Sequence, residues 1–119
     1  MQNYEPDSTF RFYFQSMDVY RTARQFLAWT RHLLPRLGRG FASERDQLRR
    51  AALSILLNIA EGAEQETRPM KRKHYRIARG STGECAALLD ALAVFEIAEL
   101  HEGIVLSRRL GAMLTKLSR

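Results

Sequence analysis

The sequence is poor in the residues on which several classes of protein depend. A single cysteine, Cys85, excludes an internal disulfide framework and favours a reducing, cytoplasmic compartment. No apolar run approaches the roughly 18 residues that a membrane-spanning helix needs, so we expect no membrane partner. The beginning of the chain lacks a basic segment followed by an apolar one, and we expect no secretory signal. A length of 119 residues fits one domain with a single core.

The common motifs of catalysis and cofactor binding are also missing. The sequence has no phosphate-binding loop, no nucleophile elbow and no dinucleotide fingerprint. Its histidines, His32, His74 and His101, are far apart, and none has the spacing of a metal site. We interpret His74 as a packed or hydrogen-bonded residue and Cys85 as a small core residue on the same helix face, rather than as a nucleophile pair. The expectation is a protein with no enzymatic activity, no catalytic residue, no cofactor and no metal.

Acidic residues are fewer than basic ones, and the basic excess is clustered. The chain has 13 acidic and 19 basic residues, a net charge of +6 and a pI near 10.1. The stretch 68–79 contains no acid, and its candidate nucleic-acid-binding residues are Arg68, Lys71, Arg72, Lys73, Arg76 and Arg79. Such clustering is typical of proteins that bind a polyanion. The alternative is that the charge only keeps a small protein in solution.

Strand patterns are nearly absent, and helical periodicity dominates from about residue 16. Apolar residues recur at steps of three and four in four segments, which are separated by Pro35, by a polar connection before Pro69 and by a turn at 98–101. Ser43 and Thr67 are expected to cap the second and third helices. The pattern predicts an all-α fold, an up-down-up-down antiparallel four-helix bundle over residues 16–119.

The first 15 residues do not share this periodicity. Phe10, Phe12 and Phe14 alternate as in a strand, but no other segment offers a strand partner. We therefore expect residues 1–15 to form an irregular N-terminal arm whose aromatic side chains dock on a neighbouring surface.

The third helix carries an ambiguous segment at Gly80–Gly83. Ser81 and Glu84 match a capping box, which would stop and restart the helix. Alternatively, the small residues allow close helix approach within one long helix, and the unbroken phase of the apolar face favours this continuous helix. The predicted core face consists of Met70, His74, Ile77, Ser81, Cys85, Leu88, Leu92 and Phe95.

The second helix is apolar over more of its circumference than a surface helix requires. Its narrow polar stripe is expected, together with one residue of the third helix, to form a structural polar network that fixes helix register. The members of this network are Arg50, Ser54, Asn58, Glu61 and Glu84. An enzyme using Glu61 and Glu84 as paired acids, together with Asn58, is the weaker alternative. Two outward apolar surfaces predict a homo-oligomer interface, and their residues are Leu53, Leu57, Ala60, Ala93, Val94 and Ile97.

Two motifs carry a resemblance to a known family. The run Asn58-Ile59-Ala60-Glu61-Gly62 and the later run from Ala78 to Glu84 resemble the four-helix-bundle proteins found as reading frames in intervening sequences of large-subunit ribosomal RNA genes. The resemblance implies a bundle that assembles into a ring, typically a pentamer. Related bundles are accessory proteins of diversity-generating reverse transcriptases, which implies nucleic acid and a reverse transcriptase or other protein as partners.

Together these observations predict a non-enzymatic, ring-forming bundle that binds the backbone of RNA or DNA through a basic face. The alternative is an oligomeric scaffold that docks a protein partner and binds no nucleic acid. Pairing of the basic residues with Glu96, Glu99 or Glu102 of a neighbouring subunit would favour the scaffold.

Overall fold

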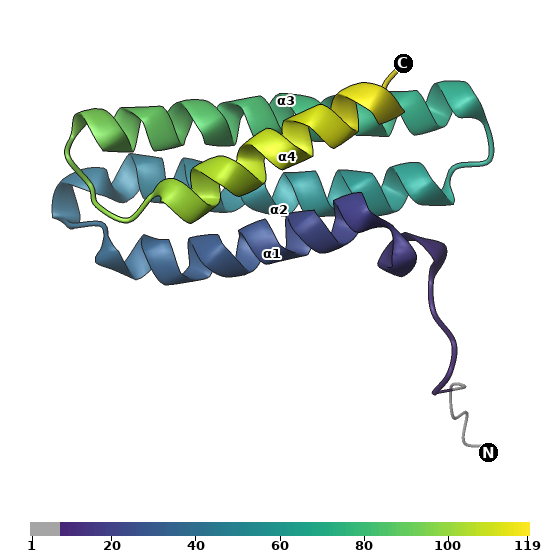
Figure 1. The fold of residues 1–119 in the computed structure, drawn as a ribbon, viewed down its shortest axis with the longest axis horizontal. Coiled ribbons are helices and arrows are strands. Elements are labelled where there is room, and N and C mark those ends of the chain that lie inside the picture. The colour runs from purple at the N-terminus through teal and green to yellow at the C-terminus, as the bar shows by residue number, and fades with distance from the viewer. Residues whose placement is uncertain (1–7) are drawn as a thin grey trace.

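Four long helices form the body of the molecule, for which a computed structural model describes residues 8–119 (Figure 1). Their bounds are Asp18–Leu33 (α1), Ala42–Glu64 (α2), Arg68–Val94 (α3) and His101–Leu117 (α4). Short 3-10 turns cover Tyr13–Ser16, Leu34–Arg36 and Arg39–Phe41. Successive helices run in opposite directions, and α1 also packs against α4, which closes the bundle. The predicted all-α four-helix bundle is confirmed, and residues 8–119 contain no strand.

The core lies along the axis between the four helices. Every helix contributes an apolar stripe with steps of three and four residues, as packing between neighbouring helices requires. The largest fully buried side chains are Phe26, Leu33, Leu48, Ile55, Ile59, Leu89, Leu92, Leu110 and Leu114.

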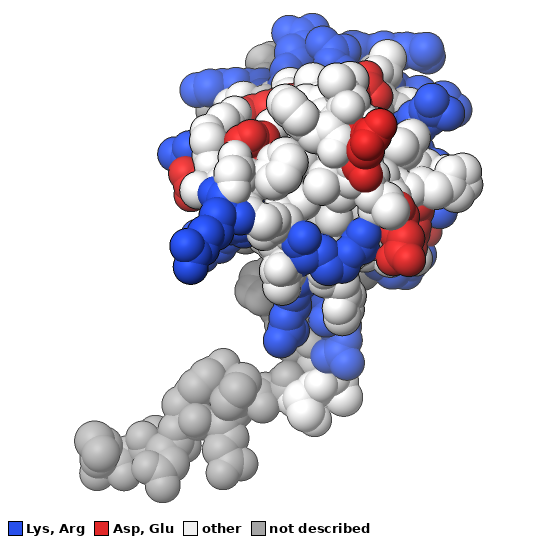
Figure 2. Space-filling view, turned by 90° about the vertical axis from the view of Figure 1, so that its left-hand side faces the viewer, with Lys and Arg blue, Asp and Glu red and all other residues white. Residues whose placement is uncertain are grey.

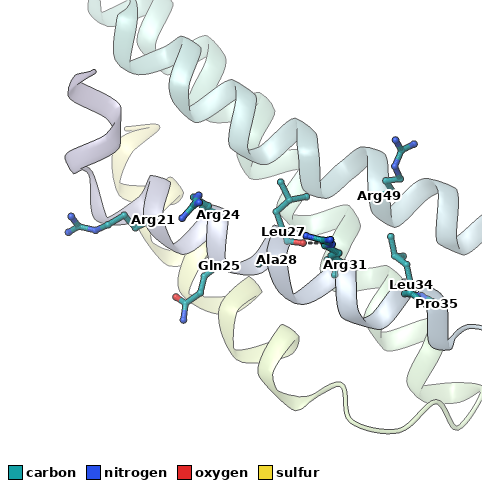
Figure 3. Close-up of a pocket in the computed structure, with 10 residues that line it drawn as sticks. Arg21, Arg24, Gln25, Leu27, Ala28, Arg31, Leu34, Pro35 and Arg49 are labelled. Atoms are coloured by element: carbon teal, nitrogen blue, oxygen red, sulfur yellow. Dashed lines mark hydrogen bonds between the residues drawn. The ribbon is translucent and has the colours of Figure 1, made fainter. Parts of the chain in front are cut away.

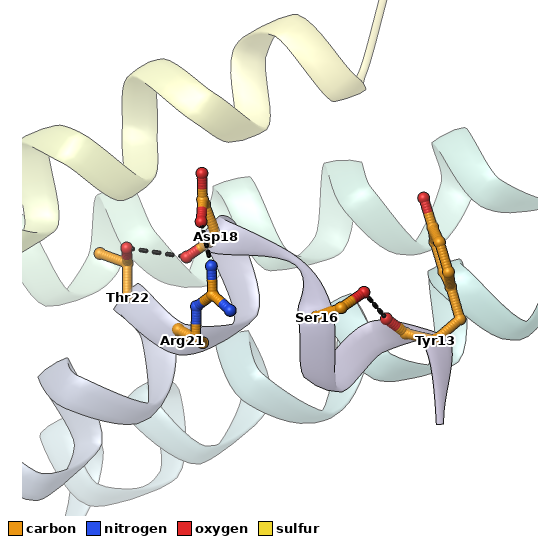
Figure 4. Close-up of polar contacts among 5 residues, drawn as sticks. All are labelled: Tyr13, Ser16, Asp18, Arg21 and Thr22. Atoms are coloured by element: carbon orange, nitrogen blue, oxygen red, sulfur yellow. Dashed lines mark hydrogen bonds and ion pairs between the residues drawn. The ribbon is translucent and has the colours of Figure 1, made fainter. Parts of the chain in front are cut away.

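The chain enters α1 through a tight turn that is held by local hydrogen bonds (Figure 4). The Ser16 hydroxyl donates to the carbonyl of Tyr13 at 2.7 Å, and the Thr22 hydroxyl donates to the carbonyl of Asp18 at 2.9 Å. Asp18 also pairs with Arg21 in the first turn, where a carboxylate favours the helix dipole.

Part of the predicted arm, residues 1–7, lies outside the described residues. From Ser8 onward the aromatic side chains form a chain of ring contacts, with Phe12 stacked on Phe14 at 5.4 Å and Phe14 against Tyr20 at 4.8 Å. Phe10 and Phe12 remain exposed. Phe14 is thus the residue that joins this segment to α1.

Helix α3 runs without interruption through Gly80 and Gly83, as the phase of its pattern predicted. A Cβ atom added at either glycine would meet no atom within 4 Å, so neither glycine serves a close helix approach in this chain. The helix begins where expected, because the Met70 amide donates to the Thr67 hydroxyl. The Ser43 prediction was wrong: α2 begins at Ala42, and the Ser43 hydroxyl accepts a hydrogen bond from Gln47.

The predicted core face of α3 needs a correction. Met70, Ile77 and Phe95 are exposed, and the buried residues of α3 are Tyr75, Ala78, Thr82, Cys85, Leu89 and Leu92. The inward face is therefore turned away from these large apolar side chains. Two of the residues on that inward face, Ala78 and Thr82, are small and almost fully buried.

Candidate nucleic-acid interface

The clustered basic residues lie on the first half of α3. Helical spacing places Arg72, Arg76 and Arg79 on one side, away from the buried face. Lys73, Arg76 and Arg79 are exposed, and Arg72 is half-buried. The ion pairs among residues 8–119 are Asp18–Arg21, Arg36–Glu99, Asp46–Arg50 and Glu61–His74. No described acid therefore neutralises this row of cations.

Two of the predicted contact residues have structural partners. The Arg68 guanidinium donates to the main-chain oxygen of Arg119 at 3.1 Å, which ties the start of α3 to the end of the chain. The Lys71 ammonium donates to the carbonyls of Ala63 at 2.9 Å and Gly62 at 3.4 Å. These carbonyls end α2, where the Gly62 carbonyl also accepts from the Gln65 amide at 3.2 Å, so Lys71 adds a side-chain cap to this helix end.

Basic side chains crowd one side of the bundle, and others are spread over the rest of the surface in view (Figure 2). Figure 2 looks along the bundle from the end that carries the α1–α2 and α3–α4 connections. Lys and Arg side chains crowd its upper edge, which is the side of α3 and α4 in Figure 1. Helix α4 contributes the exposed Arg108 and Arg109. The acidic side chains in this view lie mainly on the end facing the viewer.

A polar cluster joins α2 to α3 beside the basic row. The Asn58 amide donates to the Ser54 carbonyl and hydroxyl at 3.0 and 3.2 Å, and the Ser81 hydroxyl donates to the Ser54 hydroxyl at 2.9 Å. Nδ1 of His74 lies 3.2 Å from Oδ1 of Asn58 and 3.3 Å from Oε2 of Glu61. Because both partners are acceptors, this nitrogen must carry the proton. His74 is thus a hydrogen-bonded residue between two helices.

The cluster differs in membership from the predicted polar network. The structure brings Ser54, Asn58 and Glu61 together, whereas Arg50 pairs with Asp46 at 3.1 Å. Arg50 and Glu84 do line one hollow of about 260 Å³ together with Ser54, but no hydrogen bond joins them to the cluster. Sequence reasoning missed the two contributions of α3, which are His74 and Ser81. The signal that could have found them is their spacing, because residues seven apart lie on the same face of a helix.

Cys85 lies deep in the core. Burial, followed by the nearby charge of Glu84, raises the pKa of its thiol to about 12. The thiolate is the nucleophilic form, so this side chain is unreactive at neutral pH. Burial also raises the pKa of Tyr75, with a smaller effect from Tyr13. Among residues 8–119 no three His, Cys, Asp or Glu side chains gather as a metal site would require.

The predicted oligomer surfaces are largely exposed in the single chain. Leu53 and Leu57 on α2 have exposed fractions of 43% and 49%, and Val94 at the end of α3 has 79%. Ala93 is also exposed, whereas Ala60 and Ile97 are half-buried. Phe95, which the sequence placed in the core, is 61% exposed and enlarges the second surface.

A groove between α1 and α2 was not predicted from the sequence (Figure 3). It has a volume of about 780 Å³. Leu27 and Leu34 point towards α2 in this view, and arginines stand around them from both helices. The lining arginines are Arg21, Arg24, Arg31 and Arg49. Periodicity locates the faces of α1 and α2 but not the distance between the helices, and the groove depends on that distance.

None of the helices within residues 8–119 combines the length and apolar character of a membrane span. Comparison with curated proteins gave no match. The model of one family, described as 23S rRNA-intervening sequence protein, matches residues 15–118. This match covers all four helices, in agreement with the resemblance carried by the motifs of α2 and α3. The chain therefore belongs to the 23S rRNA-intervening sequence protein family.

Proposed function

We propose that the protein is a non-enzymatic homo-oligomer that binds the backbone of RNA or DNA through the basic row of α3. The observation that carries this proposal is the row itself: Arg72, Lys73, Arg76 and Arg79 lie on a rigid helix, and no described acid pairs with them. Lys and Arg side chains placed in this way neutralise phosphates and release counterions, which drives binding to nucleic acid. The description of the family, which refers to 23S rRNA, supports RNA as the first ligand to test.

The chemistry of the row favours backbone contact over reading of the sequence. The one aromatic side chain within it, Tyr75, is buried against α2 and offers no ring on which a base could stack. Guanidinium and ammonium groups alone position a protein on phosphates and carry little sequence information. Assembly of several subunits would repeat the row and add avidity to weak single contacts. From the family resemblance we expect five subunits.

The test is RNA and duplex DNA binding across a salt series, with the mass of the protein measured in the same samples. For the wild type we expect binding that weakens steeply with salt. Changing Arg72, Arg76 and Arg79 to Glu should abolish binding and leave the mass unchanged. The matched control changes Arg108, Arg109 and Lys116 of α4 to Glu and alters the net charge equally. An equal loss in both variants would contradict the α3 row as the binding surface, because α4 or net charge would then contribute as much.

The second candidate is an oligomeric scaffold for a protein partner. The exposed apolar side chains of Leu53, Leu57, Val94 and Phe95 favour it, because nucleic-acid backbones do not require such surfaces. A wild-type oligomer that binds neither RNA nor DNA at low salt would favour the scaffold over the nucleic-acid proposal.

A further inference from the structure

Two surfaces of the same chain are complementary in charge, and each also carries apolar side chains. The first is the arginine groove, formed by Arg24, Leu27, Arg31, Leu34 and Arg49. The second is the acidic turn, formed by Val94, Phe95, Glu96, Glu99 and Glu102. We infer that the arginine groove of one copy receives the acidic turn of a second copy. This inference rests on the proposed homo-oligomer and names the surfaces that build it.

The arginine groove combines free cations with an aliphatic floor. No described acid pairs with Arg24, Arg31 or Arg49, whereas Arg21 at the edge of the groove pairs with Asp18. The floor continues along α2, because Leu53 and Leu57 lie one and two turns beyond Arg49 on the same side of the helix. About half of each of these leucines is exposed, so the groove opens onto an apolar stripe.

The acidic turn is held in a shape that presents its side chains outward. Glu96 and Glu99 have φ angles of 62° and 61°, a left-handed conformation that sharply reverses the chain after α3. The Arg36 guanidinium donates to the carbonyl of Ala98 at 2.6 Å, and Phe95 rests edge-on against Phe41 at 5.6 Å. The connection therefore has tertiary support although Val94 and Phe95 are largely exposed.

The chemistry of the groove selects a protein surface over a nucleic acid as its occupant. A nucleic-acid backbone would satisfy the arginines alone, whereas Leu27 and Leu34 at the floor of the groove gain only from an apolar partner. A surface with apolar side chains in the centre and carboxylates around them satisfies both the leucines and the arginines. The acidic turn supplies both kinds of side chain, the exposed Val94 and Phe95 and three glutamates, and it is present on every copy at the same concentration as the groove.

The contact joins two different surfaces and is therefore heterologous. Each copy can donate its acidic turn to one neighbour and accept the turn of another in its groove. Such a contact gives a closed ring when the rotation between copies closes, and a filament when it does not.

The experiment measures mass by light scattering for purified full-length variants with exchanged charges. Arg24→Glu with Arg31→Glu should lower the mass to that of one chain, 13.7 kDa. Glu96→Lys with Glu102→Lys should do the same, and Glu99 is left in place because it pairs with Arg36. A protein with all four changes restores the complementarity and should regain the wild-type mass. That recovery separates a direct contact from misfolding of the single variants.

Matched controls change the same charge elsewhere. Arg108→Glu with Arg109→Glu, and Glu66→Lys with Glu84→Lys, alter exposed residues outside both surfaces and should leave the wild-type mass unchanged. A monomeric wild type would overturn the proposed homo-oligomer itself. A wild-type oligomer whose mass survives both charge reversals would overturn only the assignment of surfaces. Loss of RNA binding at unchanged mass in the Arg24 and Arg31 variant would assign the groove to nucleic acid and also overturn the inference.

Discussion

At the scale of single residues, two glycines of α4 have opposite roles. A Cβ atom at Gly103 would overlap the ring atoms Cη2 and Cζ3 of Trp29, so the absence of a side chain lets α4 pack against α1. A Cβ atom at Gly111 would meet nothing within 4 Å. The first glycine is required by packing, and the second only weakens its helix.

We expect Gly103→Ala to lower the free energy of unfolding by about 1–3 kcal/mol, because the rigid indole must move. Gly111→Ala, the control on the same helix, should raise it by about 0.5–1 kcal/mol through helix propensity. Urea denaturation of both variants measures the two effects. Equal changes in the two variants would contradict the packing role of Gly103.

The buried thiol gives a second prediction at this scale. Because the pKa of Cys85 is raised from 9.0 to about 12, the thiol should resist a thiolate-selective reagent in the native protein at pH 8 and react once the protein is unfolded. As the pH rises, the Cys85 thiol loses its proton in the unfolded protein before it does so in the folded protein. Its contribution to stability is therefore present below pH 9 and lost as the pH rises towards 12. The free energy of unfolding of the wild type, measured by denaturation, should therefore fall relative to that of Cys85→Ala between pH 9 and pH 12. Rapid labelling of the native protein would contradict the burial.

Sequence reasoning at this scale succeeded where the signal was local. Thr67 precedes a proline in the first turn of a helix, and its hydroxyl does cap that helix. Ser43 has the right side chain, but the 3-10 turn before α2 brings the helix start forward to Ala42. The overlap of Gly103 with Trp29 joins residues far apart in the chain, and no local pattern contains it.

At the scale of elements, the polar cluster around Asn58 bridges α2 and α3. This side chain donates to Ser54 on its own helix and accepts from His74 on the next. A buried polar group that loses its partner costs more than the net gain of its hydrogen bond, so the cluster favours one register between the two helices.

A double-mutant cycle tests this pairing. Asn58→Ala and His74→Ala should each destabilise the protein, and their coupling energy should lie in the range of about 0.5–3 kcal/mol. The control pairs Asn58→Ala with Thr115→Ala on α4, where the two effects should add. Additivity in the Asn58 and His74 cycle would mean that their contact contributes nothing to stability.

The elements themselves could be predicted because each carries many repeats of one period. All four helices and the continuity of α3 follow from that repetition. The face that α3 turns towards the core does not follow from it. Tyr75 and Thr82 are buried on that face, but they carry polar atoms, and a count of apolar residues therefore gives them little weight. The basic row was visible in the sequence, whereas the arginine groove was not.

At the scale of the whole molecule, we expect the proposed assembly and the proposed binding to nucleic acid to be separable. The basic row and the two proposed contact surfaces consist of different residues. A variant that breaks the oligomer without changing charge should keep the row intact and lose only the gain from multivalency.

Leu53→Ser with Leu57→Ser is such a variant. We expect it to dissociate into single chains and to bind a long RNA about 10²–10⁴-fold more weakly than the wild type. Its affinity for an RNA too short to contact two subunits should match that of the wild type. Electrophoretic mobility shifts with long and short RNA of one composition measure both values. Equal weakening for both lengths would contradict the separation of the two functions.

The unbroken length of α3 has a further consequence for how the molecule meets a polyanion. Its 27 residues span about 40 Å, several times the screening distance of about 8 Å at physiological ionic strength. The helix begins among cations and ends beside Glu96 and Glu99. The positive end of its macrodipole therefore coincides with the basic side chains, and the negative end with the acidic ones. Helix α3 is thus polarised along its length, and a negatively charged polymer would be attracted to its basic end before any contact is made.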